Sequence, residues 1–525
     1  MKKIIYQSCL AGLCLMLSAC PSGKNKSPKK EKKKEQVKTY SYSVRMEAAT
    51  ELDAAPALQS FVHATHGDEW LLFAGRTNAE ADEGGLHKQA QDANYSNQSF
   101  VPISFNTRLY SYNYASNKLY QMEFEALKSK LKSWGDSLNS SKSKLSTLLL
   151  NYHAQLQANG KIFRISNPQC TQVDSFLYVI GGYGPALDDV NSAKSYKTSA
   201  HFARIHVPTM LKVVESKWDE LSLRQWKDLF RFGTNSTLKA TGGEMFKLGE
   251  KFYLAGGHNY QHISPSQTYL NCVYKFDLTA DDQTYTLSAT NIDTISDKTP
   301  SQLKNDTALV DSTSKFRRRD GPIVPTLYTL NQATHEGISF YGGVFKYHFA
   351  AWNKAIHIQP GLGQEYIEVD SSDFYMNNYN VYSCPDFGIL DKGSNVIHTF
   401  LPGGIGNGKD DNNLSAFTNT LGHATYNFKN SEMTFEAKPN CFSEEFFGAE
   451  AAFLPSSNSV YDSLNGKQTE LIHGDKTFPV LDDEVMVGYI YGGIQAFEGS
   501  PSTYGPGKSA ATNRIWRVLV KRTEK

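Results

Sequence analysis

Three consecutive arginines followed by an aspartate are the residues of this sequence best suited to binding an anion: Arg317, Arg318, Arg319 and Asp320. A guanidinium group is a planar fork that matches a carboxylate or a phosphate. If the run lies on a strand, its first and third arginines share one face and the second points to the other. A structural interpretation competes with this one, in which Asp320 caps a turn and pairs with an arginine while Glu444 and Glu445 neutralise the rest. We favour this structural ion network over the anion site.

Histidines and a tyrosine in two other segments are further candidate ligands. His63 and His66 could hold a metal ion, but three positions apart on a strand they face opposite sides, so polar core histidines are favoured. His258, Tyr260 and His262 could form a polar and aromatic rim for a sugar or a peptide, although packing or loop exposure is favoured. These groups therefore predict no metal and no cofactor.

Compact catalytic motifs are missing from the sequence. It contains no G-x-S-x-G, no H-E-x-x-H and no glycine-rich phosphate loop. The oxygen-rich stretch 406–413 (GNGKDDNN) lacks the spacing of a calcium loop and is interpreted as a solvated turn. No catalytic residue is predicted, but a hydrolase, lyase or isomerase that uses Arg318 or Arg319 with Glu445 or Asp320 remains the alternative.

The first 38 residues predict an export signal and an anchor. Lys2 and Lys3 precede an apolar run at 8–19, and Leu17-Ser18-Ala19-Cys20 resembles the lipobox of a bacterial lipoprotein, which implies cleavage after residue 19 and lipid on Cys20. Residues 20–38 carry eight lysines and predict a disordered tether. Attraction of this basic run to anionic lipid head groups is favoured over nucleic-acid binding. We expect the protein to be localised to the outer membrane, on either of its two faces.

Composition favours a folded β-rich body. Of 525 residues, 40% are hydrophobic, 12% aromatic and 20% charged, and 39 are glycine, which excludes a mainly disordered chain and favours strands with tight turns. Four cysteines remain after the signal and the lipid site: Cys170, Cys272, Cys384 and Cys441. They are isolated and form no C-x-x-C pair, which argues against zinc. Free buried thiols are favoured over two disulfides.

One local pattern recurs six times along the body. An apolar run ends in a glycine turn at 70–76, 176–184, 252–260, 338–346, 398–406 and around Gly492-Gly493. Alternating runs follow three of these copies, at Thr107–Tyr114, Asn271–Leu278 and Asn513–Val520. Glycine at the turn allows positive φ and a close approach to neighbouring backbone. The first copy has Ala74-Gly75 in place of a glycine pair, and the copies are spaced more widely than ~50 residues.

This pattern resembles the kelch repeat. The resemblance implies an all-β fold for residues 39–525, a six-bladed kelch-like β-propeller whose last blade is closed by the N-terminal strand at 39–47. Inner strands are expected at 60–69, 163–173, 235–248, 317–329, 379–390 and 442–454, with the arginine run at the channel mouth. Apolar residues at helical spacing predict helical insertions at about 124–157 and 208–230.

Phe316–Pro325 and Val487–Ile494 resemble segments of uncharacterised kelch-type envelope proteins of the Bacteroidota. That resemblance implies an envelope address and no activity. The predicted function is therefore a lipid-anchored, non-catalytic binding or assembly scaffold, which captures a ligand or joins an outer-membrane receptor or assembly complex. The alternative is a propeller enzyme that acts on a glycan or another anionic substrate.

Overall fold

The computed structural model describes residues 38–78, 100–139, 143–186, 188–189, 192–262, 266–305, 307–346, 350–352, 354–369, 381–406, 417–443, 445–497 and 509–525. The chain divides into two compact units, Met1–Val37 and Lys38–Lys525. The first unit, with the predicted signal, Cys20 and nearly all of the tether, lies outside the described residues. No helix among the described residues is long and apolar enough to cross a membrane.

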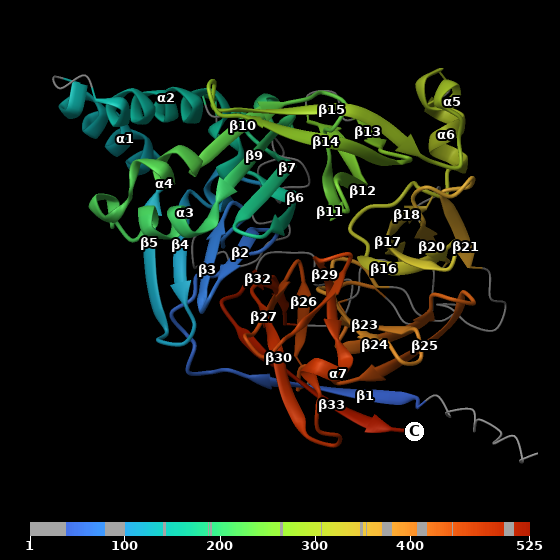
Figure 1. Ribbon diagram of the computed structural model, residues 1–525. Coiled ribbons are helices and arrows are strands. Elements are labelled where there is room, and N and C mark those ends of the chain that lie inside the picture. Colours follow the sequence, from blue (N-terminus) through green and yellow to red (C-terminus); the bar gives the residue numbers. More distant parts are fainter. Residues whose placement is uncertain are drawn as a thin grey trace, which may run out of the picture. The chain divides into compact units, whose positions relative to one another are not determined.

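Within the described residues, the strands form seven sheets of unequal size (Figure 1). The terminal strands share a four-stranded sheet in the order β1 (Tyr40–Ala48), β33 (Ile515–Glu524), β30 (Glu484–Tyr491) and β27 (Ala452–Pro455). The largest sheet has ten strands, and its main path runs through β11 (Thr241–Leu248), β12 (Lys251–Gln261), β14 (Val273–Asp281), β15 (Thr286–Ile295), β10 (Phe230–Thr234), β9 (His201–His206), β7 (Phe176–Gly184) and β6 (Ser166–Val173). Beside that path, β13 (Ser266–Tyr269) pairs with β12, and β8 (Lys197–Thr198) pairs with both β12 and β7.

The five remaining sheets are smaller. Two have four strands, in the orders β2 (Val62–His66), β3 (Glu69–Phe73), β4 (Arg108–Asn113), β5 (Lys118–Glu123), and β16 (Ile323–Leu330), β17 (Ala333–Phe340), β20 (Ala355–Ile358), β21 (Tyr366–Val369). One has six, in the order β25 (Glu432–Pro439), β24 (Thr420–Asn427), β23 (Val396–Pro402), β22 (Phe387–Asp391), β29 (Lys467–His473), β28 (Tyr461–Leu464). The last two are β26 (Phe446–Ala449), β31 (Ile494–Ala496), β32 (Ser509–Ala511), and the pair β18 (Val344–Lys346), β19 (Ala350–Ala351).

The prediction of an all-β chain with six separate blades is wrong. The protein is mostly β, with 50% strand and 17% helix, and its ten-stranded sheet contains a closed ring of seven strands because β8 joins β12 to β7. Parallel pairs, β10 with β15 and β22 with β29, join groups of strands that separate blades would keep apart. A glycine turn reports only a local need for tight backbone approach. It carries no information on how the strands beyond that turn pair with their neighbours.

The terminal strands β1 and β33 are antiparallel partners along their length. Their register runs from Tyr40 opposite Glu524 to Ala48 opposite Trp516, and Figure 1 shows the two strands side by side. The expected pairing of the N-terminal strand with the C-terminal strand is therefore present. It completes a four-stranded sheet, not the last of six blades.

The glycine turns lie where one segment passes against the next. Gly182 has a φ of +85° and donates its N–H to the carbonyl oxygen of Ala240 at 2.7 Å. Gly257 has a φ of +90° and donates to the carbonyl oxygen of Arg318 at 2.8 Å. A Cβ added at Gly181 would overlap the carbonyl oxygen of Ala240. The expected role of glycine, positive φ with close backbone approach, is confirmed at these turns.

Helices occupy the two stretches where helical spacing was predicted. They are α1 (Phe124–Asn139) and α2 (Lys144–Asn159) in the first stretch, and α3 (Val207–Val214) and α4 (Leu223–Asp228) in the second. Elsewhere lie the short helices α5 (Pro300–Asn305), α6 (Thr307–Thr313) and α7 (Gly474–Thr477), and the 3₁₀ turns η2 (Pro102–Ser104), η3 (Gly160–Phe163), η4 (Ala193–Ser195) and η5 (Trp218–Glu220). Ser143 caps α2, because its side chain accepts the Ser146 N–H at 3.0 Å.

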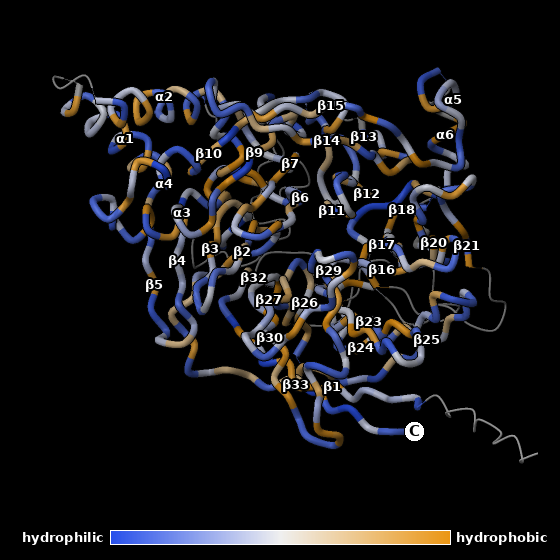
Figure 2. Tube along the Cα trace, in the orientation of Figure 1, coloured by the Kyte–Doolittle hydropathy of each residue, from blue (hydrophilic) through white to orange (hydrophobic). Residues whose placement is uncertain are grey.

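The helices are anchored on the sheets by their apolar sides. Leu127, Leu131 and Tyr152 from α1 and α2 are buried in one cluster with strand residues such as Phe230. Figure 2 colours the chain by hydropathy and shows hydrophobic residues concentrated along strands such as β9 and β30. These helical faces are therefore occupied by the scaffold. The four cysteines of the body, Cys170, Cys272, Cys384 and Cys441, are free thiols.

Candidate functional site: a carboxylate-lined cavity inside a ring of six residues

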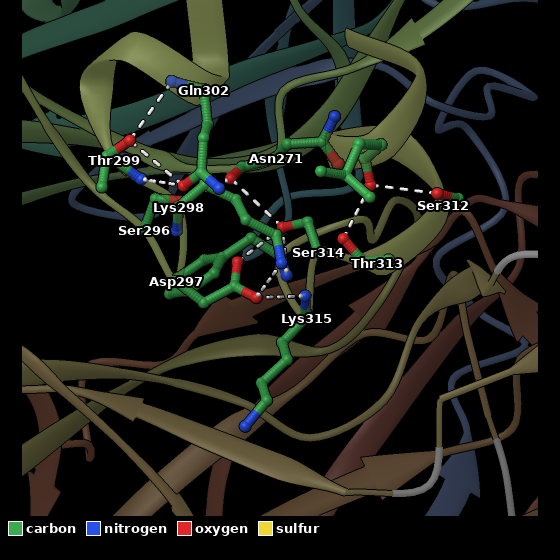
Figure 3. A network of polar contacts seen from close by, with 12 residues as sticks. Asn271, Ser296, Asp297, Lys298, Thr299, Gln302, Ser312, Thr313, Ser314 and Lys315 are labelled. Atoms are coloured by element: carbon green, nitrogen blue, oxygen red, sulfur yellow. Dashed lines mark hydrogen bonds and ion pairs between the residues drawn. The ribbon is translucent and has the colours of Figure 1, made fainter. Parts of the chain in front are cut away.

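The arginine run is not part of a regular strand. β16 begins at Ile323, and the three arginines precede it in a loop in which Arg319 makes an isolated bridge to Val344. Figure 3 shows the polar network that fixes the preceding segment. Asp297 accepts the Ser314 hydroxyl at 2.8 Å and the Lys315 N–H at 3.2 Å. The simple alternation expected from a strand at 317–329 therefore does not apply.

Each arginine of the run has partners within the protein. Arg317 Nε lies 3.2 Å from Asp311 Oδ1, and its guanidinium lies 3.9 Å from the ring centre of Tyr269. Arg318 is fully buried, and it donates to the carbonyl oxygens of Lys315 at 2.9 Å, Gly342 at 3.2 Å and Lys354 at 2.8 Å. Arg319 Nε lies 3.2 Å from Asp320 Oδ2. The Arg319–Asp320 pair agrees with the structural interpretation of the run. The expected neutralisation by Glu445 is wrong, because Arg317 pairs with Asp311 and Glu445 pairs with Arg514.

The other candidate residues are distributed around the molecule. Glu445 accepts hydrogen bonds from Arg514 at 2.6 Å and Gln495 at 3.0 Å, and Glu444 lies outside the described residues. His258 Nε2 lies 3.2 Å from Arg319 Nη1, and burial beside this arginine lowers the pKa of His258 well below its usual value.

Tyr260 packs on Tyr183 with their ring centres 5.5 Å apart, and its N–H donates to Thr198 Oγ1 at 2.8 Å. His63 lines the cavity described below, and burial lowers its pKa to about 4. His66 is exposed. Of the ligand-binding candidates, only His63 and Asp320 therefore line that cavity.

Six residues with left-handed backbone form a ring at the centre of the described body. Their φ angles lie between +51° and +69°, and each falls in one of the six expected inner segments: Ser60, Asn167, Gly242, Asp320, Ser383 and Glu450. Five backbone hydrogen bonds link them in one direction, from Asn167 N–H to Ser60 O (3.1 Å), Asp320 to Gly242 (2.7 Å), Ser383 to Asp320 (2.5 Å), Glu450 to Ser383 (2.6 Å) and Ser60 to Glu450 (3.3 Å). Between Gly242 and Asn167, the neighbouring Thr241 hydroxyl donates to Asn167 O at 3.1 Å.

One cavity lies at this ring, and a second adjoins the first. The smaller holds about 270 Å³, and its lining includes all six ring residues. The larger holds about 760 Å³, and its lining includes residues of hairpin turns such as Asp174, Gly249 and Gly466. Both are lined by His63, Cys170, Pro325, Asp386, Phe453 and Glu470, so the two cavities adjoin. The volume of the larger one is in the range of small-molecule sites.

The smaller cavity is rich in carboxyl groups, one of which, Asp320, pairs with Arg319. Five carboxyl groups line the smaller cavity, and no described lysine or arginine does: Glu244, Asp320, Asp386, Glu450 and Glu470. Lys247 and Lys467 line the larger cavity, and each forms an ion pair with Glu250. The smaller cavity is therefore lined by acidic groups, while the two lysines of the larger cavity pair with Glu250.

Crowding of carboxylates changes their acidity. Removal from water and the charge of Glu470 raise the pKa of Asp386 to about 8. Desolvation, opposed by a hydrogen bond from the Thr171 hydroxyl at 3.2 Å, raises the pKa of Glu470 to about 7. Desolvation and the neighbouring charges of Asp386 and Glu470 raise the pKa of Glu244 well above its usual value. Near neutral pH this cavity therefore holds protons that a bound cation could displace.

The ring and cavity contain candidate residues that the sequence analysis did not single out. Glu244, Asp386 and Glu450 lie within expected inner segments, at 235–248, 379–390 and 442–454, so scanning those segments for acidic residues would have found them. Glu470 lies on β29, outside every expected inner segment, and no signal in the sequence pointed to it. In the part of the chain that the structure describes, no three His, Cys, Asp or Glu side chains are grouped to hold a metal ion.

Comparisons with known proteins find matches among solved structures alone. No family model matches the sequence, and no curated protein matches it. Among solved structures, 143 chains match. One, described as the structure of YjhT, is 11% identical, covers 90% of this chain and 99% of its own, and superposes with a TM-score of 0.42.

Proposed function

We propose that this protein is a non-catalytic binding protein that captures a positively charged organic ligand in its carboxylate-lined cavity. The observation that carries the proposal is the set of five carboxyl groups around a space of about 270 Å³ that no described lysine or arginine lines. An anionic ligand would meet repulsion there. A protonated amine or guanidinium would replace the lost water contacts of these carboxylates with charge-assisted hydrogen bonds.

Ligand size and apolar contact are consistent with capture of a small molecule or of a basic side chain of a peptide. The adjoining cavity of about 760 Å³ offers Phe387, Phe453 and Tyr461 as apolar surface beside the charged end. Pockets that combine a few polar groups with apolar walls are typical of organic-ligand sites.

The enzymatic alternative used Arg318 or Arg319 with Glu445 or Asp320. Arg318 and Glu445 are engaged with other protein groups, and Arg319 and Asp320 pair with each other. The cavity offers a different pair for such an enzyme. Asp386 and Glu470, with pKa values raised to about 8 and about 7, are suited to proton transfer near neutral pH. Turnover that Asp386→Asn and Glu470→Gln each abolish would favour this alternative.

Calorimetric titration tests the binding proposal. We expect a cationic probe, spermidine or arginine methyl ester, to bind at pH 7 and to release protons, because a bound cation favours the ionised forms of Asp386 and Glu244. Titration in two buffers of different ionisation enthalpy measures that release. We expect Asp386→Asn and Glu244→Gln to weaken binding about tenfold each, on the scale of a charged hydrogen bond.

Glu432→Gln is the matched control, because this carboxylate is exposed and does not line the cavity. Binding of the matched anion N-acetylglycine with equal affinity, or cation binding that no cavity variant weakens, would contradict the proposal.

We also propose that lipid on Cys20 holds the protein at the outer membrane, where it joins a receptor or assembly complex. The sequence of the lipobox supports this address. Cys20→Ser should move the protein from the membrane fraction to the soluble envelope fraction. Protease treatment of intact cells, followed by pull-down from detergent-solubilised membranes, distinguishes surface capture with a receptor from a periplasmic assembly role.

A further inference from the structure

A second cleft, which shares no lining residue with the acidic cavity, has the opposite character. It holds about 510 Å³ and lies between the end of β3, the turn η2, strand β4 and the residue that follows η3. No described carboxylate lines it. Its charged lining residues are the two arginines Arg108 and Arg164.

Only one of these arginines is neutralised inside the protein. Arg108 forms an ion pair with Glu123, which also accepts the Thr107 hydroxyl at 2.9 Å. The guanidinium of Arg164 has no hydrogen-bond or ion-pair partner among the described residues, and its Nε is buried without one. A buried N–H donor without an acceptor is costly unless a ligand or water supplies one. Arg164 is therefore the residue of the cleft whose guanidinium is available to bind an anion.

The other residues of the cleft are apolar or already have hydrogen-bond partners within the protein. Phe105 and Tyr110 form buried parts of its wall, and Ile103, which is 58% exposed, adds accessible apolar surface. The Tyr110 hydroxyl donates to Asn106 Oδ1 at 3.3 Å, so that amide is engaged as well. A fitting ligand would have a planar anionic group for Arg164 and an apolar body for Ile103 and Phe105.

We propose that the Arg164 cleft binds an organic carboxylate with an apolar or aromatic body. A free organic acid and the C-terminus of a peptide that ends in an apolar residue share this chemistry. In both cases the carboxylate pairs with the guanidinium fork. The proposal does not depend on the cationic ligand of the acidic cavity, because the two sites have different residues and opposite charge.

Titration of the full chain with three probes tests this site. The probes are N-acetylphenylalanine, a tripeptide that ends in phenylalanine with a free carboxylate, and the same tripeptide as the C-terminal amide. We expect the carboxylate probes to bind and the amide to bind at least tenfold more weakly, since it cannot form the ion pair. Tighter binding of the tripeptide acid than of N-acetylphenylalanine identifies a peptide terminus as the source; the reverse identifies a free acid.

Three variants localise the binding. Arg164→Gln should weaken binding of the acids at least tenfold while leaving the amide unchanged, and Arg164→Lys should recover part of the affinity. Ile103→Ser should weaken all three probes several-fold through lost apolar contact. Arg45→Gln is the charge-matched control on an exposed, ion-paired arginine and should have no effect.

Either of two results would overturn the proposal. In the first, the wild type does not bind the acids even at 10 mM, a concentration about a hundredfold above a dissociation constant of 0.1 mM. The other is equal binding by wild type and Arg164→Gln. If Arg164→Gln does not fold, as judged by circular dichroism, Arg164→Lys and Ile103→Ser decide the question by the same criterion.

Discussion

Replacing Asp386 by asparagine should change how the stability of the protein depends on pH. Burial and Glu470 raise the pKa of Asp386 from its ordinary 3.8 to about 8. The folded protein therefore binds a proton more tightly than the unfolded chain does, so stability falls as pH rises between about 4 and 8. Asparagine keeps the shape of the side chain but cannot ionise, and the variant lacks this contribution.

The size of the effect follows from the shift. Each pH unit inside that window corresponds to about 1.4 kcal/mol for one group. Between pH 5 and pH 8 the full effect would be about 4 kcal/mol, and water in the cavity screens part of it, so we expect about 2 kcal/mol. The free energy of unfolding of Asp386→Asn should thus gain about 2 kcal/mol on that of the wild type between these two pH values.

Urea unfolding followed by tryptophan fluorescence at pH 5, 6, 7 and 8 measures this difference. Glu432→Gln, on the exposed surface, should run parallel to the wild type throughout. If the curves of Asp386→Asn and wild type are also parallel, the carboxyl ionises as it does in water and the reasoning about the cavity fails. A variant that instead loses stability relative to the wild type as pH rises would reverse the sign and refute it equally.

Three further predictions concern the scaffold. Gly181→Ala should cost at least 2 kcal/mol more in unfolding free energy than Gly249→Ala, since both have positive φ but only Gly181 faces a carbonyl oxygen that a Cβ would overlap; equal costs in urea unfolding would contradict this. Arg318→Gln should lower the free energy of unfolding by about 3 kcal/mol, because buried carbonyl oxygens lose their donor. A loss less than about 1 kcal/mol larger than that of the surface control Arg45→Gln would count against this prediction. A chain that begins at Lys38 should keep the melting temperature of the full chain, whereas one that begins at Glu51 should melt lower, because β1 covers β33; calorimetry distinguishes the two.

Local backbone requirements were readable from the sequence. Gly182 and Gly257 mark tight turns because no other residue combines positive φ with a close approach, and that requirement acts within a few residues. The apolar spacing through Leu127, Leu131 and Tyr152 likewise reflects one face of a helix. Such signals depend on neighbours in the chain.

Pairing between distant segments was not readable in the same way. The strands β10 and β15 meet through a single parallel pair, Phe232 with Thr286, and nothing in either segment specifies that contact. Glu244 and Glu470 lie more than two hundred residues apart in the chain and share a cavity only because the ring closes. The arginine run drew attention through its composition, but the fold uses its charges internally.

The ring of six left-handed residues determines which changes of sequence could alter ligand selectivity at the smaller cavity. Along five of its links, backbone N–H and carbonyl groups are taken up by one another. Those N–H groups are not available to a ligand, so recognition at the ring falls mainly to its side chains. Small or neutral residues stand at Ser60, Asn167, Gly242 and Ser383, against carboxylates at Asp320 and Glu450. Exchange among residues that tolerate this backbone, chiefly glycine, asparagine, aspartate and serine, could reverse the selectivity of the aperture while its frame stays intact.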